Sequence, residues 1–222
     1  MDRRHLTAAL LAGSWPGWLR AAASESDAAT GVRAALERGA QAAVSSLGRT
    51  DGFLGDPRVR IPLPGYLEKA AKLLKATGQG KRVDELVTAM NRAAEAAVPE
   101  ARTLFVSTVK AMSVEDALKL VRGGPTSVTD YFAAKTRAPL GEKFLPIVSR
   151  ATQNVKLAER YNQLAAKAAG MGLVKGDEAS VQQHVTRHAL DGLYLMIGEE
   201  EKKIRADPLQ TGSALLQKVF GR

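Results

Sequence analysis

The chain has 222 residues, of which 45% are hydrophobic and 25% are charged, and it contains no cysteine. This is the composition of a globular protein, and the lack of cysteine excludes disulfides, thiol catalysis and metal sites with cysteine ligands. Aromatic residues make up only 5%, and β-branched residues rarely alternate with polar ones. We therefore predict an all-α fold, a single-domain bundle of several helices. The formal net charge is +9, but the basic residues are dispersed among acidic ones without a cluster, which argues against nucleic acid as a partner.

The first 23 residues predict an export signal. The pair Arg3-Arg4 forms a basic start, an apolar run extends from Leu6 to Leu19, and Ala21 and Ala23 have the small-x-small spacing of a cleavage site. The arginine pair also resembles a twin-arginine signal, so the Sec and twin-arginine routes both stay open. We predict a periplasmic protein whose single helical domain spans residues 24–222, with no transmembrane segment and no cofactor.

An amphipathic surface helix is the alternative for this N-terminal segment. Pro16 and Gly17 interrupt its helical period, which favours the export signal. Removal of residues 1–23 takes away three arginines and one aspartate, so the net charge falls by two, from +9 to +7. A loosely anion-attracting surface is the simplest interpretation of that charge.

The helical pattern of the mature chain is interrupted after its first helix, which we expect from about Ser26 to Leu47. Residues 51–64, DGFLGDPRVRIPLP, hold three of the nine prolines, and Pro62 and Pro64 force the residues before them into extended conformations. The segment is too apolar for a solvated linker, so we predict a stiff strap with alternate side chains buried on the helices. Asp51 and Arg60 are the candidates to bond neighbouring carboxylates or backbone.

Further helices are expected along the rest of the chain, including one that begins with the capping box SVED at 113–116. Proline and glycine set most of their expected ends. The expected ranges are 66–76, 80–98, 99–111, 113–121, 126–137, 140–169 and 179–206, with a last helix that holds Leu215, Leu216, Val219 and Phe220.

A line of polar residues is expected along one edge of the helix that starts near Gly80. A rotation of about 100° per residue places Val83, Val87, Met90, Ala94 and Val98 on the apolar face. Such a polar row either presents a carboxylate pair and an amide to a ligand or bonds the strap through Arg60, and the second role is the more common one. The row consists of Asp84, Thr88, Asn91 and Glu95.

The helix expected over 179–206 places Glu200 near the middle of its apolar arc. A carboxylate there requires a partner or has a raised pKa. Arg60, Arg92 and Lys135 are candidate partners, and a buried ion pair is favoured over a catalytic acid.

Two histidines and an aspartate on the same helix have a spacing that a divalent metal uses. His184, His188 and Asp191 lie at i, i+4 and i+7. Two histidines on a polar face are mostly solvated, and no second acidic motif accompanies them, so we predict no metal site.

Seven motifs in order make the chain resemble a bacterial family of exported proteins with a domain of unknown function, family four-one-nine-seven. The resemblance covers roughly residues 27–221 and implies a helical protein without an assigned activity. The motifs are TDGFLGDPRVRIPLP, MNRAAEAAVPEA, MSVEDAL, TDYF, KFLPIV, ALDGLY and EEEKKIRADP. The polar positions that the resemblance implies are Asp51, Arg60, Asn91, Arg92, Glu95, Glu100, Asp116, Asp130, Asp191, Glu199, Glu200, Lys203 and Arg205.

No Gly-rich phosphate loop, nucleophile elbow or His-Glu-x-x-His motif occurs in the sequence. We therefore expect a non-catalytic module that binds a cell-envelope component or another protein, with the strap covering or bordering the site. The alternatives are a purely structural role and a hydrolase or lyase that uses Glu95, Glu100 and Glu200 as acid and base, with Arg60 or Arg92 holding an anionic substrate. The residues predicted to form the ligand site or a buried polar network are Asp51, Arg60, Asn91, Arg92, Glu95, Glu100, Asp191, Glu200 and Lys203.

Overall fold

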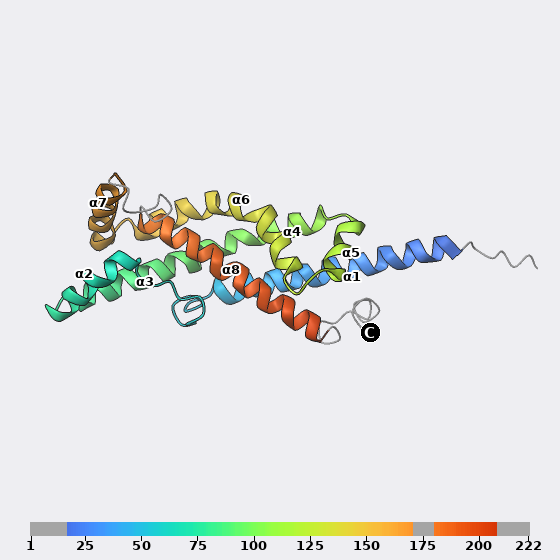
Figure 1. Ribbon diagram of the computed structural model, residues 1–222, viewed down its shortest axis with the longest axis horizontal. Coiled ribbons are helices and arrows are strands. Elements are labelled where there is room, and N and C mark those ends of the chain that lie inside the picture. The colour runs from blue at the N-terminus through green and yellow to red at the C-terminus, as the bar shows by residue number, and fades with distance from the viewer. Residues whose placement is uncertain (1–16, 171–179, 208–222) are drawn as a thin grey trace, which may run out of the picture.

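A computed structural model describes residues 17–170 and 180–207, and within these ranges the chain is helical and has no strand. This confirms the all-α prediction. The molecule is elongated, with α2 and α7 at one end and the start of α1 projecting at the other (Figure 1). The elements are α1 (Gly17–Leu47), α2 (Gly65–Ala76), α3 (Gly80–Ala97), the short 3-10 helix η1 (Val98–Glu100), α4 (Ala101–Lys110), α5 (Val114–Arg122), α6 (Ser127–Thr152), α7 (Lys156–Gly170) and α8 (Val181–Ala206).

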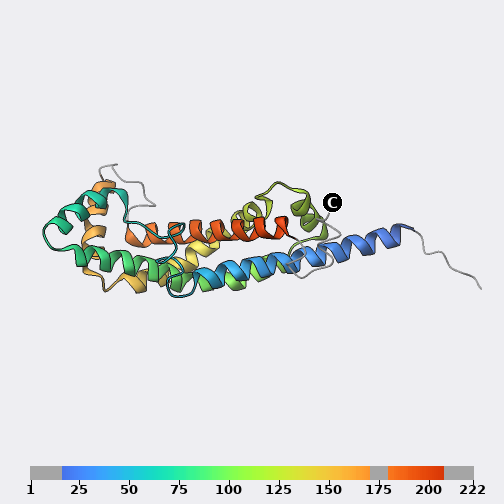
Figure 2. The same ribbon diagram turned by 90° about the horizontal axis from the view of Figure 1, so that it is seen from below.

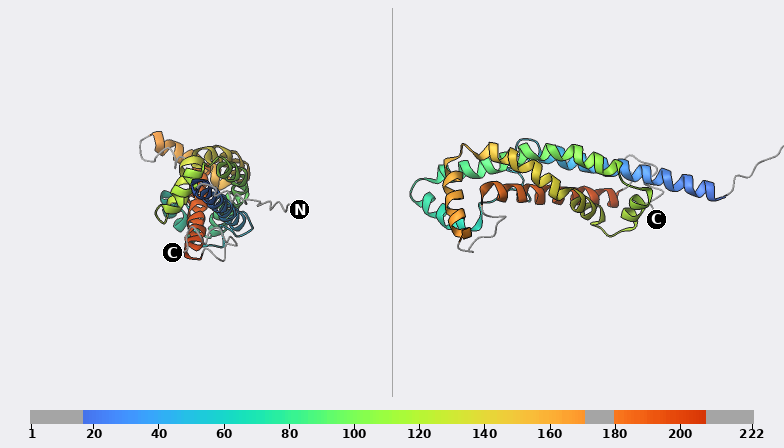
Figure 3. Two further views of the ribbon diagram at one scale, coloured as in Figure 1. Left: turned by 90° about the vertical axis from the view of Figure 1, so that its right-hand side faces the viewer. Right: turned by 90° about the horizontal axis from the view of Figure 1, so that it is seen from above.

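Helix α8 is the centre of the packing, because it contacts α1, α3 and α6. Helices α1 and α3 follow one another along one side of the molecule, and α8 runs beside both of them (Figure 2). Seen along its length, the molecule is a single bundle of helices (Figure 3). In the described part of the chain, no helix combines the length and the apolar composition that crossing a bilayer requires.

The apolar face predicted for the first helix is confirmed. The helical period of the sequence predicts a face made of Val32, Leu36, Ala40, Ala43, Val44 and Leu47, and each of these residues is at most 6% exposed. The helix itself begins at Gly17, so it continues through the predicted cleavage site. Residues 1–16, which hold most of the predicted signal, and the predicted helix near residues 215–220 lie outside the described residues. The capping box is confirmed, since the Ser113 hydroxyl accepts from the Asp116 amide and the Asp116 carboxylate accepts from the Ser113 amide.

The prolines of α6 do not end a helix, so the predicted break between residues 137 and 140 is wrong. Pro139 and Pro146 both lie inside α6, and the chain leaves the helix only at Gln153. Neither proline is on the buried stripe, and Pro146 is exposed, where water can satisfy a carbonyl that loses its helical partner. The free energy gained by burying a stripe of side chains at every fourth position of α6 therefore outweighs the local cost of the prolines. The stripe consists of Val128, Phe132, Thr136, Leu140, Phe144, Val148 and Thr152.

The strap, residues 51–64, forms turns and then an extended stretch between α1 and α2. Phe53, Val59 and Ile61 are buried, which confirms that the strap lies on the helices. At its start Asp51 has a left-handed φ of 64°. A Cβ at Gly52 would lie 2.4 Å from the Leu47 carbonyl oxygen, so the turn out of α1 requires glycine there.

Candidate functional site

Glu95 of α3 holds the first part of the strap. Its carboxylate is 4% exposed and accepts hydrogen bonds from the amides of Phe53 (3.0 Å) and Leu54 (3.1 Å) through one oxygen. The other oxygen accepts from Arg92 at 2.6 Å. No neighbouring strand in the described chain offers carbonyl groups to these two amides. The Glu95 carboxylate therefore supplies the hydrogen-bond acceptor that a buried N–H requires.

Asn91 holds the second part of the strap in the same way. Its amide oxygen accepts from the Ile61 amide at 2.9 Å, and its nitrogen donates to the Ile61 carbonyl at 3.0 Å. The side chain thus pairs with the strap as a neighbouring strand would, one turn of α3 away from Glu95. The nitrogen also donates to the Val87 carbonyl at 2.8 Å, so every polar atom of the buried Asn91 side chain is used.

Arg92 joins the strap to α3 on the solvent side. It donates to Asp51 at 2.7 Å and to Glu95 at 2.6 Å, and its own side chain is 38% exposed. These two carboxylates, Glu95 foremost, raise the pKa of the Arg92 guanidinium above its ordinary value. The arginine therefore stays charged and pairs with both acids.

Helix α8 adds one more contact to the strap, through His184. We call the five residues that fix the strap the strap anchor: Asp51, Asn91, Arg92, Glu95 and His184. The ring nitrogen Nε2 of His184 lies 2.9 Å from the Pro62 carbonyl oxygen, so it carries the proton and donates. Burial lowers the pKa of His184 from 6.5 to about 4, which keeps the ring neutral. About two turns further along α8, a Cβ at Gly192 would lie 2.9 Å from the Phe53 ring, so glycine leaves the room that the ring occupies.

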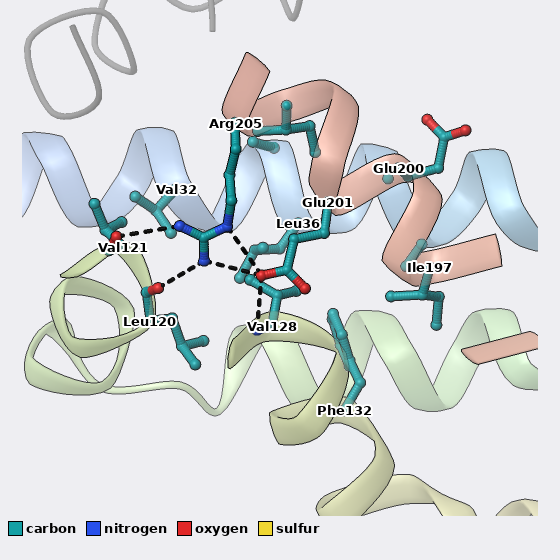
Figure 4. Close-up of a pocket in the computed structure, with 14 residues that line it drawn as sticks. Val32, Leu36, Leu120, Val121, Val128, Phe132, Ile197, Glu200, Glu201 and Arg205 are labelled. Carbon is teal, nitrogen blue, oxygen red and sulfur yellow. Dashed lines mark hydrogen bonds and ion pairs between the residues drawn. The ribbon is translucent and has the colours of Figure 1, made fainter. Parts of the chain in front are cut away.

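A second buried ion pair, Glu201–Arg205, joins the end of α5 to the start of α6. Glu201 is 3% exposed and accepts from the amides of Val128 (3.1 Å) and Thr129 (3.0 Å), which are free donors of the first turn of α6. Arg205 donates to Glu201 at 2.9 Å and to the Leu120 carbonyl at 3.0 Å. Figure 4 shows the bonds of Glu201 and Arg205 to Val128 and Leu120 converging between α5, α6 and α8.

The space beside this pair is small. It is lined almost entirely by apolar side chains of α1, α5, α6 and α8, and its volume of about 20 Å³ suits roughly one water molecule. Both charged groups are bonded to helix ends. The pair is therefore a structural junction between helices.

The prediction that Glu200 is the buried carboxylate of α8 is wrong, since that residue is its neighbour Glu201. Glu200 has a side chain 20% exposed and pairs with Lys203 at 2.6 Å. None of its expected partners, Arg60, Arg92 and Lys135, bonds it within the described ranges. Figure 4 shows its carboxylate directed away from Glu201. More residues of α8 are buried than its sequence pattern of apolar residues predicts. The pattern therefore does not distinguish between adjacent positions, and the buried acid is Glu201.

The remaining predicted residues do not join the strap anchor. Arg60 is exposed and reaches the Leu54 carbonyl at 3.4 Å, so the polar row of α3 bonds the strap without it. Asp191 pairs with Arg137 at 2.8 Å, with both side chains about half exposed. Glu100 is exposed on η1. Lys203 is exposed apart from its bond to Glu200. Of the polar row, Asp84 and Thr88 are exposed as well.

His184, Gly192, Glu201 and Arg205 have roles that the sequence analysis does not assign. Three of them lie in motifs of the family resemblance, Gly192 in ALDGLY and Glu201 and Arg205 in EEEKKIRADP. His184 is 3% exposed, which contradicts the expectation of a solvated histidine face, because the strap covers that side of α8. Among the described residues, no group of three or more acidic or histidine side chains is placed to hold a metal.

One apolar groove opens where the strap ends, between α2, α3 and α7. Its volume is about 270 Å³, close to the lower limit of roughly 300 Å³ for small-molecule pockets. Leu63 of the strap forms part of its wall, and Leu73 of α2 lies in the groove with 68% of its surface exposed. The lining residues are Leu63, Leu67, Ala71, Leu73, Leu74, Val83, Leu86, Leu157, Arg160 and Tyr161.

The fold and these contacts define an all-helical protein with a proline-rich strap that buried polar side chains fix to two helices. A family model described as a protein of unknown function, DUF4197, matches residues 22–221. The chain belongs to this family. No curated protein and no solved structure gives a significant match to the chain.

Proposed function

We propose that this protein is a non-catalytic binding module of the bacterial cell envelope, exported to the periplasm, with the apolar groove at the end of the strap as its binding site. The observation that carries the proposal is the groove itself, whose wall includes Leu63 of the strap. The strap anchor fixes the strap to α3 and α8, so this wall is rigid. A preformed wall lowers the entropy that a ligand loses on binding.

The use of the buried acids supports binding over catalysis. Glu95 bonds two strap amides and Arg92, and Glu201 bonds two α6 amides and Arg205. Acid–base catalysis requires a carboxyl that reaches the substrate. The three carboxylates of the hydrolase hypothesis have different surroundings, since Glu95 is buried, Glu200 pairs with Lys203 and Glu100 is exposed.

Export is supported by the N-terminal pattern of a basic start, an apolar run and small residues before position 24. The matched family segment begins at residue 22, close to the predicted cleavage site. The test is to fractionate cells that express the full chain and to determine the N-terminus of the protein by mass spectrometry. A periplasmic protein that begins at or near residue 24 is expected, and an uncleaved protein retained in the cytoplasm overturns this part of the proposal.

Binding is tested by thermal-shift screening of residues 24–222 against envelope lipids, cell-wall fragments and peptides. A ligand at about 100 times its dissociation constant stabilises the fold by about 2.7 kcal/mol. We expect at least one class to raise the melting temperature. The test variant is Leu73→Gln, which changes an exposed side chain in the groove and is expected to lower ligand affinity without unfolding the protein. If no class stabilises the wild type, the proposal is refuted.

A further inference from the structure

A basic hollow adjoins the apolar groove, and it consists of Arg82, Glu85, Asn154, Val155, Lys156, Leu157 and Arg160. Leu157 and Arg160 line both spaces, so the two are neighbours at the first turns of α7. The hollow therefore meets the groove at an arginine.

The hollow has an excess of positive charge. It is lined by three basic side chains and one acidic one, Glu85. Among the ion pairs of the described residues, none involves Arg82, Lys156 or Arg160, and all three residues are exposed. Arg82 donates to the side chain of Gln79 at 3.0 Å, which leaves its charge unpaired, so the three cations are available to an anion.

We infer that the groove and the hollow together bind a single-chain anionic amphiphile of the fatty-acid type. The aliphatic chain lies in the apolar groove against Leu73, Leu74 and Leu157, and the carboxylate lies at Arg160 and Arg82. An apolar space joined to a basic one matches this chemistry, because each part of the ligand finds the surroundings that it favours over water. The inference rests on the proposed function and adds the ligand class.

The experiment measures binding of dodecanoate to residues 24–222 by isothermal titration calorimetry, below the concentration at which the probe forms micelles. Two probes with the same chain, dodecyl maltoside and dodecyltrimethylammonium, replace the anionic head by a neutral or a cationic one. Octanoate keeps the head and shortens the chain. We expect dodecanoate to bind most tightly, and octanoate to bind more weakly by up to about fourfold for each methylene that is removed from the buried part of the chain.

Two pairs of variants locate the site. Leu73→Gln is compared with Leu195→Gln, since both leucines are exposed but only Leu73 lines the groove. Arg160→Gln is compared with Arg150→Gln, an exposed arginine of α6 outside the lining. We expect roughly two- to fivefold weaker dodecanoate binding for Arg160→Gln, as for an exposed charge pair, and unchanged binding for both controls. Far-ultraviolet circular dichroism verifies that each variant is folded.

Three results overturn the inference. The first is absence of dodecanoate binding, the second is equal binding of the three head groups, and the third is binding that ignores Leu73→Gln and Arg160→Gln. If other envelope fragments still stabilise the protein, only the ligand class falls and the proposed function stands. If sedimentation shows a dimer that Leu73→Gln dissociates, the groove is an interface between two copies and the inference is likewise overturned.

Discussion

Replacement of Glu95 by glutamine tests whether the strap is held by this carboxylate. Hydrogen bonds to a charged group contribute about 1.5–3 kcal/mol each, and Glu95 accepts two from the amides of Phe53 and Leu54. The pair with Arg92 adds little to this, because the arginine side chain is 38% exposed and its charge is screened by water. Glutamine keeps the shape and one neutral acceptor, so we expect Glu95→Gln to lower the free energy of unfolding by about 2–4 kcal/mol.

The assay is urea denaturation of residues 24–222 followed by circular dichroism, with the free energy of unfolding extrapolated to water. Amide hydrogen exchange provides a local measurement, and Phe53 and Leu54 are expected to exchange faster in Glu95→Gln than in the wild type. Glu100→Gln is the matched control, since Glu100 is exposed five residues further on, and its effect is expected within about 0.5 kcal/mol. If Glu95→Gln also stays within that margin, the carboxylate does not hold the strap and the reasoning is refuted.

Three further predictions concern α8. Gly192→Ala is expected to cost about 1–3 kcal/mol in urea denaturation, because the added Cβ would lie 2.9 Å from the Phe53 ring; an unchanged midpoint would show that the ring has room to move. Glu201→Gln is expected to cost about 3 kcal/mol and Glu200→Gln less than about 1 kcal/mol in the same assay, and equal costs would contradict the assignment of the buried acid. Burial lowers the pKa of His184 to about 4 in the folded protein, so the unfolded chain binds the proton more readily than the folded one. The stability present above about pH 6.5 is therefore lost as the pH falls towards 4. Wild type should therefore lose about 2 kcal/mol more than His184→Gln between about pH 7.5 and pH 5, and identical slopes would exclude this histidine as the cause.

Local rules are enough to predict the strap and most of the helices. Pro62, Pro64 and Gly52 act through short-range sterics, and the side-chain pattern of residues 53–63 shows that the strap is buried. The break predicted near Pro139 fails because burial along the whole of α6 outweighs a local preference that the sequence shows clearly.

The candidate site is less predictable than the fold, because its contacts join residues far apart in the chain. Asn91 and Glu95 are predicted as members of a polar row of four residues. Which members of that row are buried depends on where the strap crosses α3. The choice between Glu200 and Glu201 depends on a rotation of α8 smaller than the width of its apolar arc. His184 is solvated on an isolated helix and is buried only when Pro62 lies over it.

The bond between Pro62 and His184 spans 122 positions of the chain, and this has a consequence for synthesis. A chain still missing its last forty or so residues has α3 but no α8, so Phe53 has no Gly192 beside it and Pro62 has no donor. Native closure of the strap therefore waits until α8 has been synthesised. Before that point, only the strap-anchor bonds to Asn91, Arg92 and Glu95 of α3 are there to hold the strap.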